Sequence, residues 1–212
     1  MKQEEKRYKN IVFDVGGVLI GYRWEQMLLA YGLEKERAEK VGNIVFTDPI
    51  WRKFDAGLIQ IEELKAYYEE TYPEYAQDIR YFLEHAELMR VDLEDVWSYL
   101  PKLKQKGYRL YVLSNYSKVL FDLHTKGAAF LQELDGALIS YQVHKIKPDH
   151  AIYQALFERY GLDPNECCFF DDREENVIAS RECKMDAHVV TDKEDLKNCL
   201  EKLWNGSVEN LF

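Results

Sequence analysis

The sequence has few of the residues that mark fibrous, disordered or disulfide-bonded chains. Its 212 residues include only 4 cysteines, 5 prolines and 11 glycines, and this proline and glycine content is too low for a collagen-like or low-complexity chain. The cysteines match no zinc-binding spacing, and two of them are adjacent, which argues against a disulfide framework in a chain of this length. We therefore expect four reduced thiols that serve as small apolar side chains.

Long apolar runs and an excess of positive charge are also missing. No apolar stretch approaches the roughly 20 residues of a membrane span, and residues 1–10 are charged and lack the apolar core of a secretion signal. The formal net charge is −10, from 38 acidic and 28 basic residues, which disfavours binding to nucleic acid or to an anionic membrane surface. The sequence thus predicts a cytoplasmic protein with neither of those partners, in which local groups or a metal ion would hold any anionic substrate.

The chain does contain a regular alternation of short apolar runs and amphipathic helices. Hydrophobic residues make up 47% and charged residues 31% of the sequence, as in globular proteins. The predicted strands are residues 10–13, 108–113, 137–140, 167–170 and 187–190. Helical patterns between them predict an α/β fold, a Rossmann-like, doubly wound parallel sheet with helices on both faces.

The stretch after the first strand is helical throughout. Residues 24–87 carry four amphipathic stripes with no strand between them, a pattern typical of a small helical bundle. Because 212 residues are too many for one domain of about 150 and too few for two, we expect an insertion. The predicted domains are an α/β core of residues 1–20 and 90–212 and a four-helix cap of residues 21–89.

Polar side chains follow four of the predicted strands. Because ligands of open α/β sheets bind beyond the carboxyl ends of the strands, we expect these side chains to share one crevice. Each has an ordinary alternative explanation as a turn residue, a helix cap or a solvated charge, but the two adjacent carboxylates repel each other and call for a cation. These residues are Asp14, Ser114, Asn115, Lys147, Asp171 and Asp172.

Together, these residue types indicate phosphoryl chemistry. Carboxylate oxygens without a nearby histidine or cysteine favour Mg²⁺ over softer metals. A lysine and a hydroxyl beside Mg²⁺ form a site for a phosphoryl group. A carboxylate that faces the same place can act as a nucleophile.

The same residues lie in four short motifs, which are residues 13–19 (FDVGGVL), residues 113–115 (LSN), Lys147-Pro148, and Phe170-Asp171-Asp172 with Asn176. In this order they resemble the motifs of the haloacid dehalogenase-like superfamily, in the group of phosphohydrolases that carries a helical C1-type cap after the first motif. The resemblance covers essentially the whole chain.

The resemblance implies a role for each matching position. Asp14 would attack phosphorus and form an aspartyl-phosphate. Ser114 and Lys147 would bind the phosphoryl oxygens, Lys147 would also restrain the charge of the nucleophile, and Asn115 would help to orient this phosphate-binding site. The implied Mg²⁺ ligands are Asp14, the backbone carbonyl of Gly16, Asp171 and Asp172.

Gly16 departs from the usual first motif, which has a second aspartate there as general acid and base. A backbone carbonyl can still bind the metal ion, but the proton donor is lost, and general acid catalysis typically contributes about 10²- to 10⁴-fold. We expect a slower enzyme, or one that needs a good leaving group, unless water or a cap residue supplies the proton. The same replacement resembles a branch of sugar-1-phosphate phosphatases, whose anomeric leaving group is more acidic than an ordinary alcohol.

The sequence therefore predicts a Mg²⁺-dependent phosphatase, a hydrolase of a small phosphorylated metabolite such as a sugar phosphate, acting as a monomer or weak homodimer. A 2-haloacid dehalogenase is an alternative, since that group also lacks the second aspartate, but it uses no metal ion and lacks the acidic pair of the fourth motif. A non-catalytic protein that binds a phosphate ligand is a further alternative, suggested by Gly16.

Three side chains are weaker candidates for the site. Arg52, next to Trp51, or Arg23 would reach the substrate from the cap, although an arginine on a cap is most often a surface residue. His144 lies near Lys147 in the sequence, although a histidine there is most often an ordinary loop residue.

Overall fold

A five-stranded sheet lies at the centre of the protein in a computed structural model, which describes residues 7–207 and 211. The strand order is β5-β4-β1-β6-β7, and every neighbouring pair is parallel. The strands are β1 (Asn10–Phe13), β4 (Arg109–Ser114), β5 (Gly136–Ile139), β6 (Cys167–Asp171) and β7 (Asp186–Val189). All five predicted strands are therefore confirmed, each to within one residue of its expected bounds.

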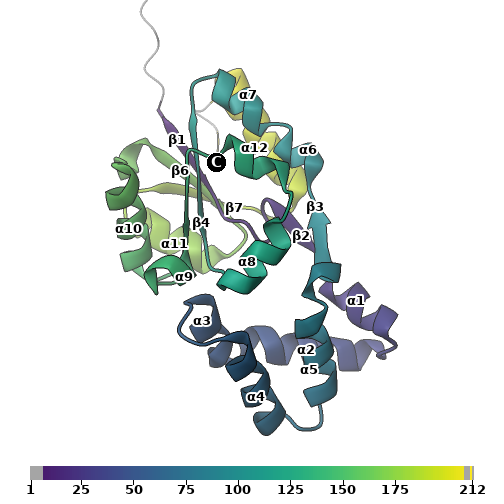
Figure 1. Ribbon diagram of the computed structural model, residues 1–212. Helices are drawn as coiled ribbons and strands as arrows, with labels where there is room; N and C mark the ends of the chain where they lie inside the picture. The colour runs from purple at the N-terminus through teal and green to yellow at the C-terminus, as the bar shows by residue number, and fades with distance from the viewer. Residues whose placement is uncertain (1–6, 208–210, 212) are drawn as a thin grey trace, which may run out of the picture.

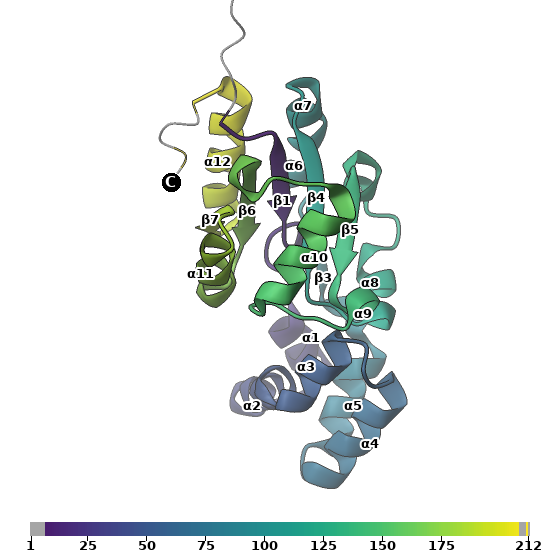
Figure 2. The ribbon, with the colours of Figure 1, turned by 90° about the vertical axis from the view of Figure 1, so that its left-hand side faces the viewer.

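Helices cover both faces of the sheet, because successive side chains of each strand point to opposite faces. On β1, Ile11 and Phe13 belong to one buried apolar cluster and Val12 belongs to the other. Each fully buried side chain of this kind contributes roughly 1.5–3 kcal/mol to folding. The covering helices are α7 (Leu100–Gln105) and α12 (Lys193–Asn205) on one face, and α10 (His150–Tyr160) and α11 (Glu174–Glu182) on the other (Figure 1 and Figure 2). The doubly wound α/β fold is confirmed.

The predicted helical insertion lies beyond the carboxyl ends of the strands, in the lower part of both ribbon views (Figure 1 and Figure 2). Within the described residues it holds five α-helices where the sequence predicted four, because the short α3 shows no apolar repeat. Asp48 caps α3 and Pro49 occupies its first turn, and both features favour a helix start. The five helices are α1 (Trp24–Tyr31), α2 (Lys35–Thr47), α3 (Pro49–Asp55), α4 (Ile61–Thr71) and α5 (Ala76–Glu84).

Two short strands join the insertion to the sheet. They are β2 (Ile20–Tyr22) and β3 (Arg90–Asp92), which pair antiparallel as a separate ribbon. The sequence analysis missed this ribbon, because each strand has only three residues and the two lie far apart in the chain. The ribbon coincides with both predicted domain boundaries, and we propose it as the hinge between a core of residues 1–20 and 90–212 and a cap of residues 21–89.

The remaining helices are short and lie mostly in connections of the core. The α-helices among them are α6 (Glu94–Trp97), α8 (Lys118–Thr125) and α9 (Ser140–Val143). The 3₁₀ helices are η1 (Ala86–Met89), η2 (Ala129–Glu133) and η3 (Pro164–Glu166). Of these elements, α9 bears most directly on the site, because it lies next to the end of α3.

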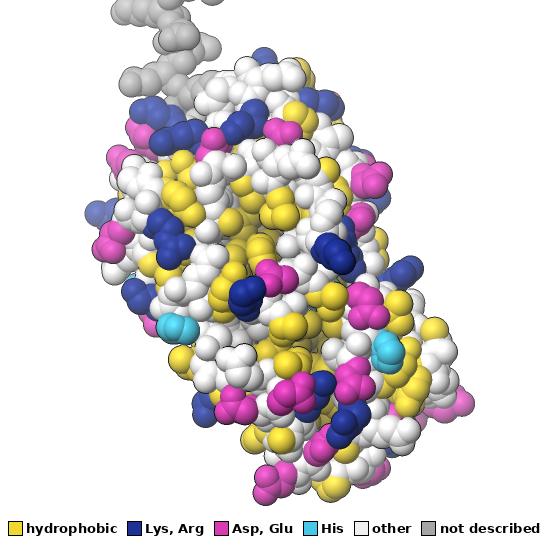
Figure 3. Space-filling view, in the orientation of Figure 1, with side chains coloured by type: hydrophobic (Ala, Val, Ile, Leu, Met, Phe, Trp, Pro, Cys, Tyr) yellow, Lys and Arg dark blue, Asp and Glu magenta, His cyan; other side chains and the backbone are white. Residues whose placement is uncertain are grey.

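The cysteines and the surface agree with the composition of the chain. The four cysteines are free, as predicted, and they are Cys167, Cys168, Cys183 and Cys199. None of the helices in the described part of the chain is long and apolar enough to cross a membrane. On the face shown in Figure 3, acidic and basic side chains are interspersed over both the core and the insertion.

Candidate active site

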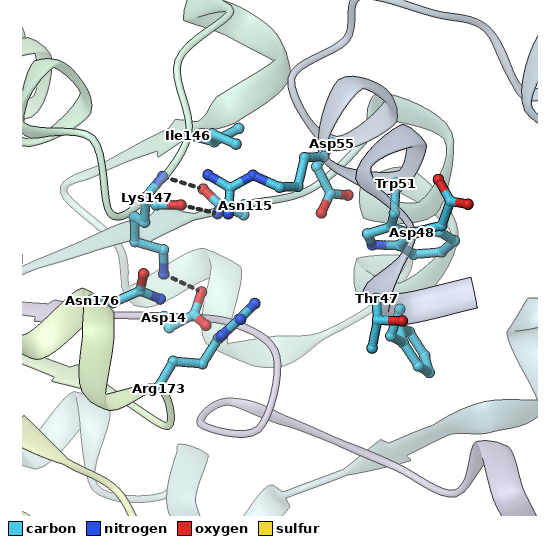
Figure 4. Close-up of a pocket in the computed structure, with 12 residues that line it drawn as sticks. Asp14, Thr47, Asp48, Trp51, Asp55, Asn115, Ile146, Lys147, Arg173 and Asn176 are labelled. Carbon is cyan, nitrogen blue, oxygen red and sulfur yellow. Dashed lines mark hydrogen bonds and ion pairs between the residues drawn. The ribbon is translucent and has the colours of Figure 1, made fainter. Parts of the chain in front are cut away.

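Three of the side chains singled out in the sequence, Asp14, Asn115 and Lys147, face one cavity where the strands end, with Trp51 and Asp55 of α3 on its other side (Figure 4). Their crevice lies between β1 and β6, where the order of the strands reverses, which is the usual ligand site of an open α/β sheet. A cavity of about 400 Å³ opens there, and a second hollow of about 220 Å³ adjoins it at Gly16, Ser114 and Asp172. The residues that line the larger cavity include Asp14, Asn115 and Lys147 from the core and Trp51, Arg52 and Asp55 from α3.

Lys147 holds the centre of the site. It is only 1% exposed, and its Nζ lies 3.0 Å from Asp14 Oδ1, 2.6 Å from Asp171 Oδ2 and 3.0 Å from the carbonyl oxygen of Leu113. Three acceptors match the three N–H donors of an ammonium group. Burial disfavours the charged form, but Asp14 and Asp171 outweigh it and raise the pKa of Lys147 above its ordinary value. Lys147 is therefore a permanent positive charge that joins the ends of three strands.

Asn115 fixes the backbone of Lys147. Its Oδ1 accepts from the Lys147 N–H at 2.8 Å, and its Nδ2 donates to the Lys147 carbonyl at 3.0 Å (Figure 4). Because both polar atoms of the amide are engaged, Asn115 orients the lysine, and a direct contact with a phosphoryl group would require it to exchange one of these bonds.

The adjacent Asp171 and Asp172 occupy very different surroundings. Asp171 is fully buried, and its two oxygens accept from the N–H of Arg173 (2.8 Å), from Asn176 Nδ2 (2.9 and 3.1 Å) and from Lys147 (2.6 Å). Asp172 is exposed and lines the second hollow. Asp171 thus orients other groups of the site, whereas Asp172 presents its carboxylate to a ligand.

The acidic group made by Asp14, Asp171 and Asp172 suits a divalent cation. One oxygen from each carboxylate can be chosen so that all lie within 4.8 Å of one another. Desolvation is the largest cause that raises the pKa of Asp172, and the charges of Asp14 and Asp171 add to it. Together they bring this pKa to about 7. Three carboxylates against the one ammonium of Lys147 leave two uncompensated negative charges, and carboxylate oxygens are preferred ligands of Mg²⁺.

Asp14 is the carboxylate best placed to react. It follows β1 directly, is 8% exposed, and its N–H donates to the carbonyl of Phe170 at 2.8 Å. The Ser114 hydroxyl acts on the Asp14 carboxylate and lowers its pKa. Burial raises the pKa of Asp14, Lys147 opposes this, and Asp171 adds to it. A metal ion beside Asp14 would favour the ionised form that a nucleophile requires.

Little space is left beside the two glycines of the first motif, Gly16 and Gly17. Gly17 has φ +72°, and a Cβ on it would lie 2.5 Å from Asp172 Oδ2. A Cβ on Gly16 would lie 3.0 Å from the ring and from the hydroxyl of Tyr22. Gly17 therefore lets the loop approach Asp172, and the Tyr22 ring fills the space beside Gly16.

Replacing Gly17 with alanine is expected to weaken Mg²⁺ binding by at least about tenfold, because the new methyl group displaces Asp172. The positive φ also costs about 1–2 kcal/mol of stability. Gly161→Ala is the matched control, since Gly161 has φ +60° with no atom within 4 Å of an added Cβ. Calorimetric Mg²⁺ titration should separate the two variants, and equal Mg²⁺ affinities would contradict the role of the Gly17 contact.

The weaker candidates fall in different places. Arg52 and Trp51 line the larger cavity, as expected for residues that reach toward a substrate. Arg23 lies near the β2–β3 ribbon, where its Nε donates to the carbonyl of Leu88 at 3.0 Å. His144 Nδ1 donates to the carbonyl of Ala56 at 2.9 Å, so it holds the end of α3 against the core.

The sequence analysis missed three further residues of the site, which are Tyr22, Asp55 and Arg173. All three line the second hollow together with Asp14. None belongs to a short motif that indicates a catalytic or binding role, and Asp55 lies on a helix that has no apolar repeat.

Comparison with known proteins agrees with this geometry. The family model described as haloacid dehalogenase-like hydrolase matches residues 8–184. An (S)-2-haloacid dehalogenase of Burkholderia cepacia is 37% identical over 70 residues, 33% of this chain and 30% of that protein. A D-ribitol-5-phosphate phosphatase of Bacteroides thetaiotaomicron is 24% identical over 187 residues, 82% of this chain and 87% of that protein.

A solved structure shows the same fold. It is a HAD family enzyme of Bacteroides thetaiotaomicron, crystallised in complex with magnesium and inorganic phosphate, with a TM-score of 0.67 and 24% sequence identity. The alignment covers 86% of this chain and 93% of that one. The similarity to that structure and to the phosphatase thus extends over most of the chain, whereas the similarity to the dehalogenase spans about a third of each protein.

Proposed function

This chain belongs to the haloacid dehalogenase-like hydrolases, and from that premise we propose that it is a Mg²⁺-dependent phosphatase of a small phosphorylated metabolite, with Asp14 as the nucleophile. One observation carries the proposal: the Asp14 carboxylate lies 3.0 Å from the Lys147 ammonium and close to the Asp172 carboxylate, and Asp14 lines both the larger cavity and the second hollow, where Ser114 and Asp172 lie. A nucleophile, two groups that bind phosphoryl oxygens and a metal ligand are thereby placed together.

The donor set supports Mg²⁺ as the cofactor. We propose that Asp14, Asp172 and the backbone carbonyl of Gly16 hold the ion, with Asp171 close behind them. The oxygens of Asp171 already accept several hydrogen bonds, so its main contribution is to orient Lys147. When bound, Mg²⁺ would neutralise charge on the phosphoryl oxygens as the transferring group develops negative charge. The magnesium and phosphate in the related Bacteroides enzyme support this assignment.

The reaction follows from what the side chains can do. Asp14 attacks phosphorus, the bond from phosphorus to the leaving oxygen breaks, and water then hydrolyses the aspartyl-phosphate and restores Asp14. Ser114 donates its hydroxyl hydrogen to a phosphoryl oxygen. Lys147 stabilises the negative charge that the phosphoryl group carries in both steps.

The size and lining of the cavity support a small polar substrate. About 400 Å³, lined by Trp51, Arg52 and Asp48 on the cap side, suits a metabolite of sugar size. The D-ribitol-5-phosphate phosphatase among the relatives supports a sugar or alditol phosphate as the substrate class. We propose that the protein acts on it as a monomer or weak homodimer, and a screen of phosphorylated metabolites would identify the substrate.

Two alternative functions would use the same residues differently. A 2-haloacid dehalogenase is supported by the short match to the Burkholderia cepacia enzyme, but the acidic group of Asp14, Asp171 and Asp172 favours a metal-dependent reaction. Release of halide from 2-chloropropionate would support the dehalogenase. A non-catalytic protein would bind inorganic phosphate without hydrolysing any phosphate ester.

The direct test is hydrolysis of p-nitrophenyl phosphate with and without Mg²⁺. We expect activity with Mg²⁺, its loss in EDTA, and its return when excess Mg²⁺ is added. The acidic group needs a cation both to bind the phosphate ester and to keep Asp14 ionised, so removal of the metal ion should lower the rate by several orders of magnitude. Full activity in EDTA would contradict the proposal.

A further inference from the structure

The replacement of an aspartate by Gly16 leaves the source of the leaving-group proton open, and Tyr22 is the first candidate to consider. Tyr22 lies beside Gly16 and hydrogen-bonds to the hydroxyl of Tyr116, which in turn contacts His124 Nδ1 at 2.9 Å. His124 Nε2 lies 2.9 Å from the carbonyl of Ala86. These contacts form one chain, and its last acceptor fixes the direction of every hydrogen bond in it.

A carbonyl can only accept, so His124 Nε2 carries the hydrogen. Burial lowers the pKa of His124, so the ring is neutral near pH 7, and its Nδ1 accepts from Tyr116. Tyr116 has only one hydroxyl hydrogen, so Tyr22 must donate to it. The Tyr22 hydrogen is therefore engaged in the bond to Tyr116, and Tyr22 is not the proton donor.

Asp55 is a second candidate that enters the site from the cap. It is the last residue of α3, is half-buried, and lines both the larger cavity and the second hollow, as Asp14 does. Figure 4 shows it reaching the cavity from the side opposite Asp14 and Lys147. A leaving group is in line with the nucleophile and on its far side, which is the side from which Asp55 approaches.

Contacts with the core hold Asp55 in this place although it belongs to the cap. The Ser140 hydroxyl donates to the backbone carbonyl of Asp55, and His144 donates to the next carbonyl, that of Ala56. Gly57 then packs so closely on α9 that an added Cβ would lie 3.0 Å from Tyr141 Cβ. The end of α3 is therefore docked on the core next to the reacting groups.

Groups from both sides of the cavity act on the Asp55 carboxylate. The backbone N–H of Ser117, in the loop after β4, and the side chain of Trp51, on the same helix, both lower the pKa of Asp55 and so favour its ionised form. Trp51 also lines both the larger cavity and the second hollow beside Asp55.

We propose that Asp55 is the general acid and base of the phosphatase reaction, in place of the aspartate that Gly16 replaces; this inference rests on the proposed function. In the first step the bond from phosphorus to the leaving oxygen breaks, its electron pair stays on that oxygen, and the oxygen takes the proton of the Asp55 carboxyl. In the second step water attacks phosphorus and gives one proton to the Asp55 carboxylate, while the bond from phosphorus to Asp14 breaks. Each turnover thus returns Asp55 to its protonated form.

The electrostatics agree with this cycle. The pKa of Asp55 is raised to about 7, chiefly by desolvation. The charge of Asp14 also raises this pKa, whereas the Ser117 N–H, Arg173 and Trp51 lower it. A pKa near the working pH lets one group serve as acid and as base. Other charged groups that line the same cavities are Arg52, Asp48, Lys147 and Asp172. Because the first step needs the protonated carboxyl, hydrolysis of esters with poor leaving groups should decline as the pH rises through about 7.

The test compares two esters of similar size, p-nitrophenyl phosphate with a good leaving group and phenyl phosphate with a poor one. For Asp55→Asn we expect kcat/KM, which reports the step that releases the leaving group, to fall about 10²-fold on phenyl phosphate and less than about threefold on p-nitrophenyl phosphate. The decline in kcat/KM for phenyl phosphate above about pH 7 should be present in the wild type and absent in Asp55→Asn. Asp55→Glu should recover part of the lost rate.

Controls separate this inference from folding and from the proposed function. Glu62→Gln, on the exposed surface of α4, removes a charge from the cap outside the cavity, and thermal melting together with Mg²⁺ titration verifies that Asp55→Asn is folded and binds the metal ion. Equal losses of kcat/KM on the two esters, or no loss on either, would overturn the role of Asp55 while leaving the phosphatase intact. Absence of Mg²⁺-dependent hydrolysis of both esters by the wild type would overturn the proposed function itself.

Discussion

Replacing Asp14 with asparagine is expected to lower kcat for every phosphate ester by about 10⁴- to 10⁶-fold, the usual effect of removing a covalent nucleophile. Asparagine has nearly the same shape, so the packing of the loop after β1 is retained. Its amide nitrogen cannot attack phosphorus, and the variant also loses the ion pair with Lys147, which lies 3.0 Å from Asp14 Oδ1. Steady-state kinetics on p-nitrophenyl phosphate would measure the effect.

The matched control for this variant is Asp122→Asn. Asp122 is an exposed residue of α8 that pairs with Lys118 on the surface, so its kcat should equal that of the wild type. A variant at Asp14 that keeps more than about a tenth of the wild-type kcat would exclude Asp14 as the nucleophile, because no partial loss of that size follows from removing a covalent step.

Replacing Lys147 with methionine is expected to cost about 3–5 kcal/mol of unfolding free energy, the largest effect on stability at this site. Methionine fills much of the same space, but it leaves Asp14 and Asp171 buried without the charge that balances them. Activity should also be lost, because methionine carries no positive charge to stabilise the phosphoryl oxygens. Urea denaturation at neutral pH would measure the loss of stability.

The loss of stability in Lys147→Met should depend on pH. Burial raises the pKa of Asp14 and Lys147 opposes this shift, so without Lys147 the folded-state pKa of Asp14 lies further above its value in the unfolded chain. The penalty for the ionised Asp14 carboxylate is therefore fully present above the folded-state pKa and disappears as the pH falls below the unfolded value. The stability difference between wild type and variant should narrow as the pH is lowered from 7 toward 4.

Lys145→Met provides the control, since Lys145 is exposed two residues away, and its effect should stay within about 0.5 kcal/mol. A Lys147 variant as stable as this control would show that the buried ion pairs contribute nothing to the fold.

The fold was predictable because its signals are local. The strand at residues 10–13 is an apolar run that ends at an aspartate, and the strand at residues 167–170 repeats that pattern. Parallel strands place their carboxyl ends at one edge, so local patterns sufficed to bring Asp14, Lys147 and Asp172 to one crevice. The five-stranded order then follows from the usual right-handed connections.

Other parts of the site depend on contacts between distant segments, which no local pattern shows. Asp171 and Asp172 are adjacent in sequence, yet only the hydrogen bonds from Lys147, Asn176 and the backbone of Arg173 show that Asp171 orients other groups. For the same reason the amide of Asn115 was expected near phosphate, and its bonds to the backbone of Lys147 emerged only from the packed loops.

The cap was the least predictable part. The docking of α3 is set by Ser140 and His144, which lie far along the chain from Asp55 and contact only backbone carbonyls. The packing of Tyr22 against Gly16 depends in turn on the β2–β3 ribbon, whose strands are too short to leave a pattern. Residues that act through such contacts become visible only when the fold brings the segments together.

The proposed role of Asp14 as the nucleophile can be tested by one measurement, the identification of the residue that carries the phosphoryl group during turnover. Enzyme mixed with p-nitrophenyl phosphate and Mg²⁺, stopped in acid within milliseconds and digested, would be analysed by mass spectrometry. We expect one phosphoryl group on the peptide that contains Asp14, together with a burst of p-nitrophenol equal to the enzyme present, and neither in Asp14→Asn. A phosphoryl group on another residue, or turnover that persists in Asp14→Asn, would contradict the account.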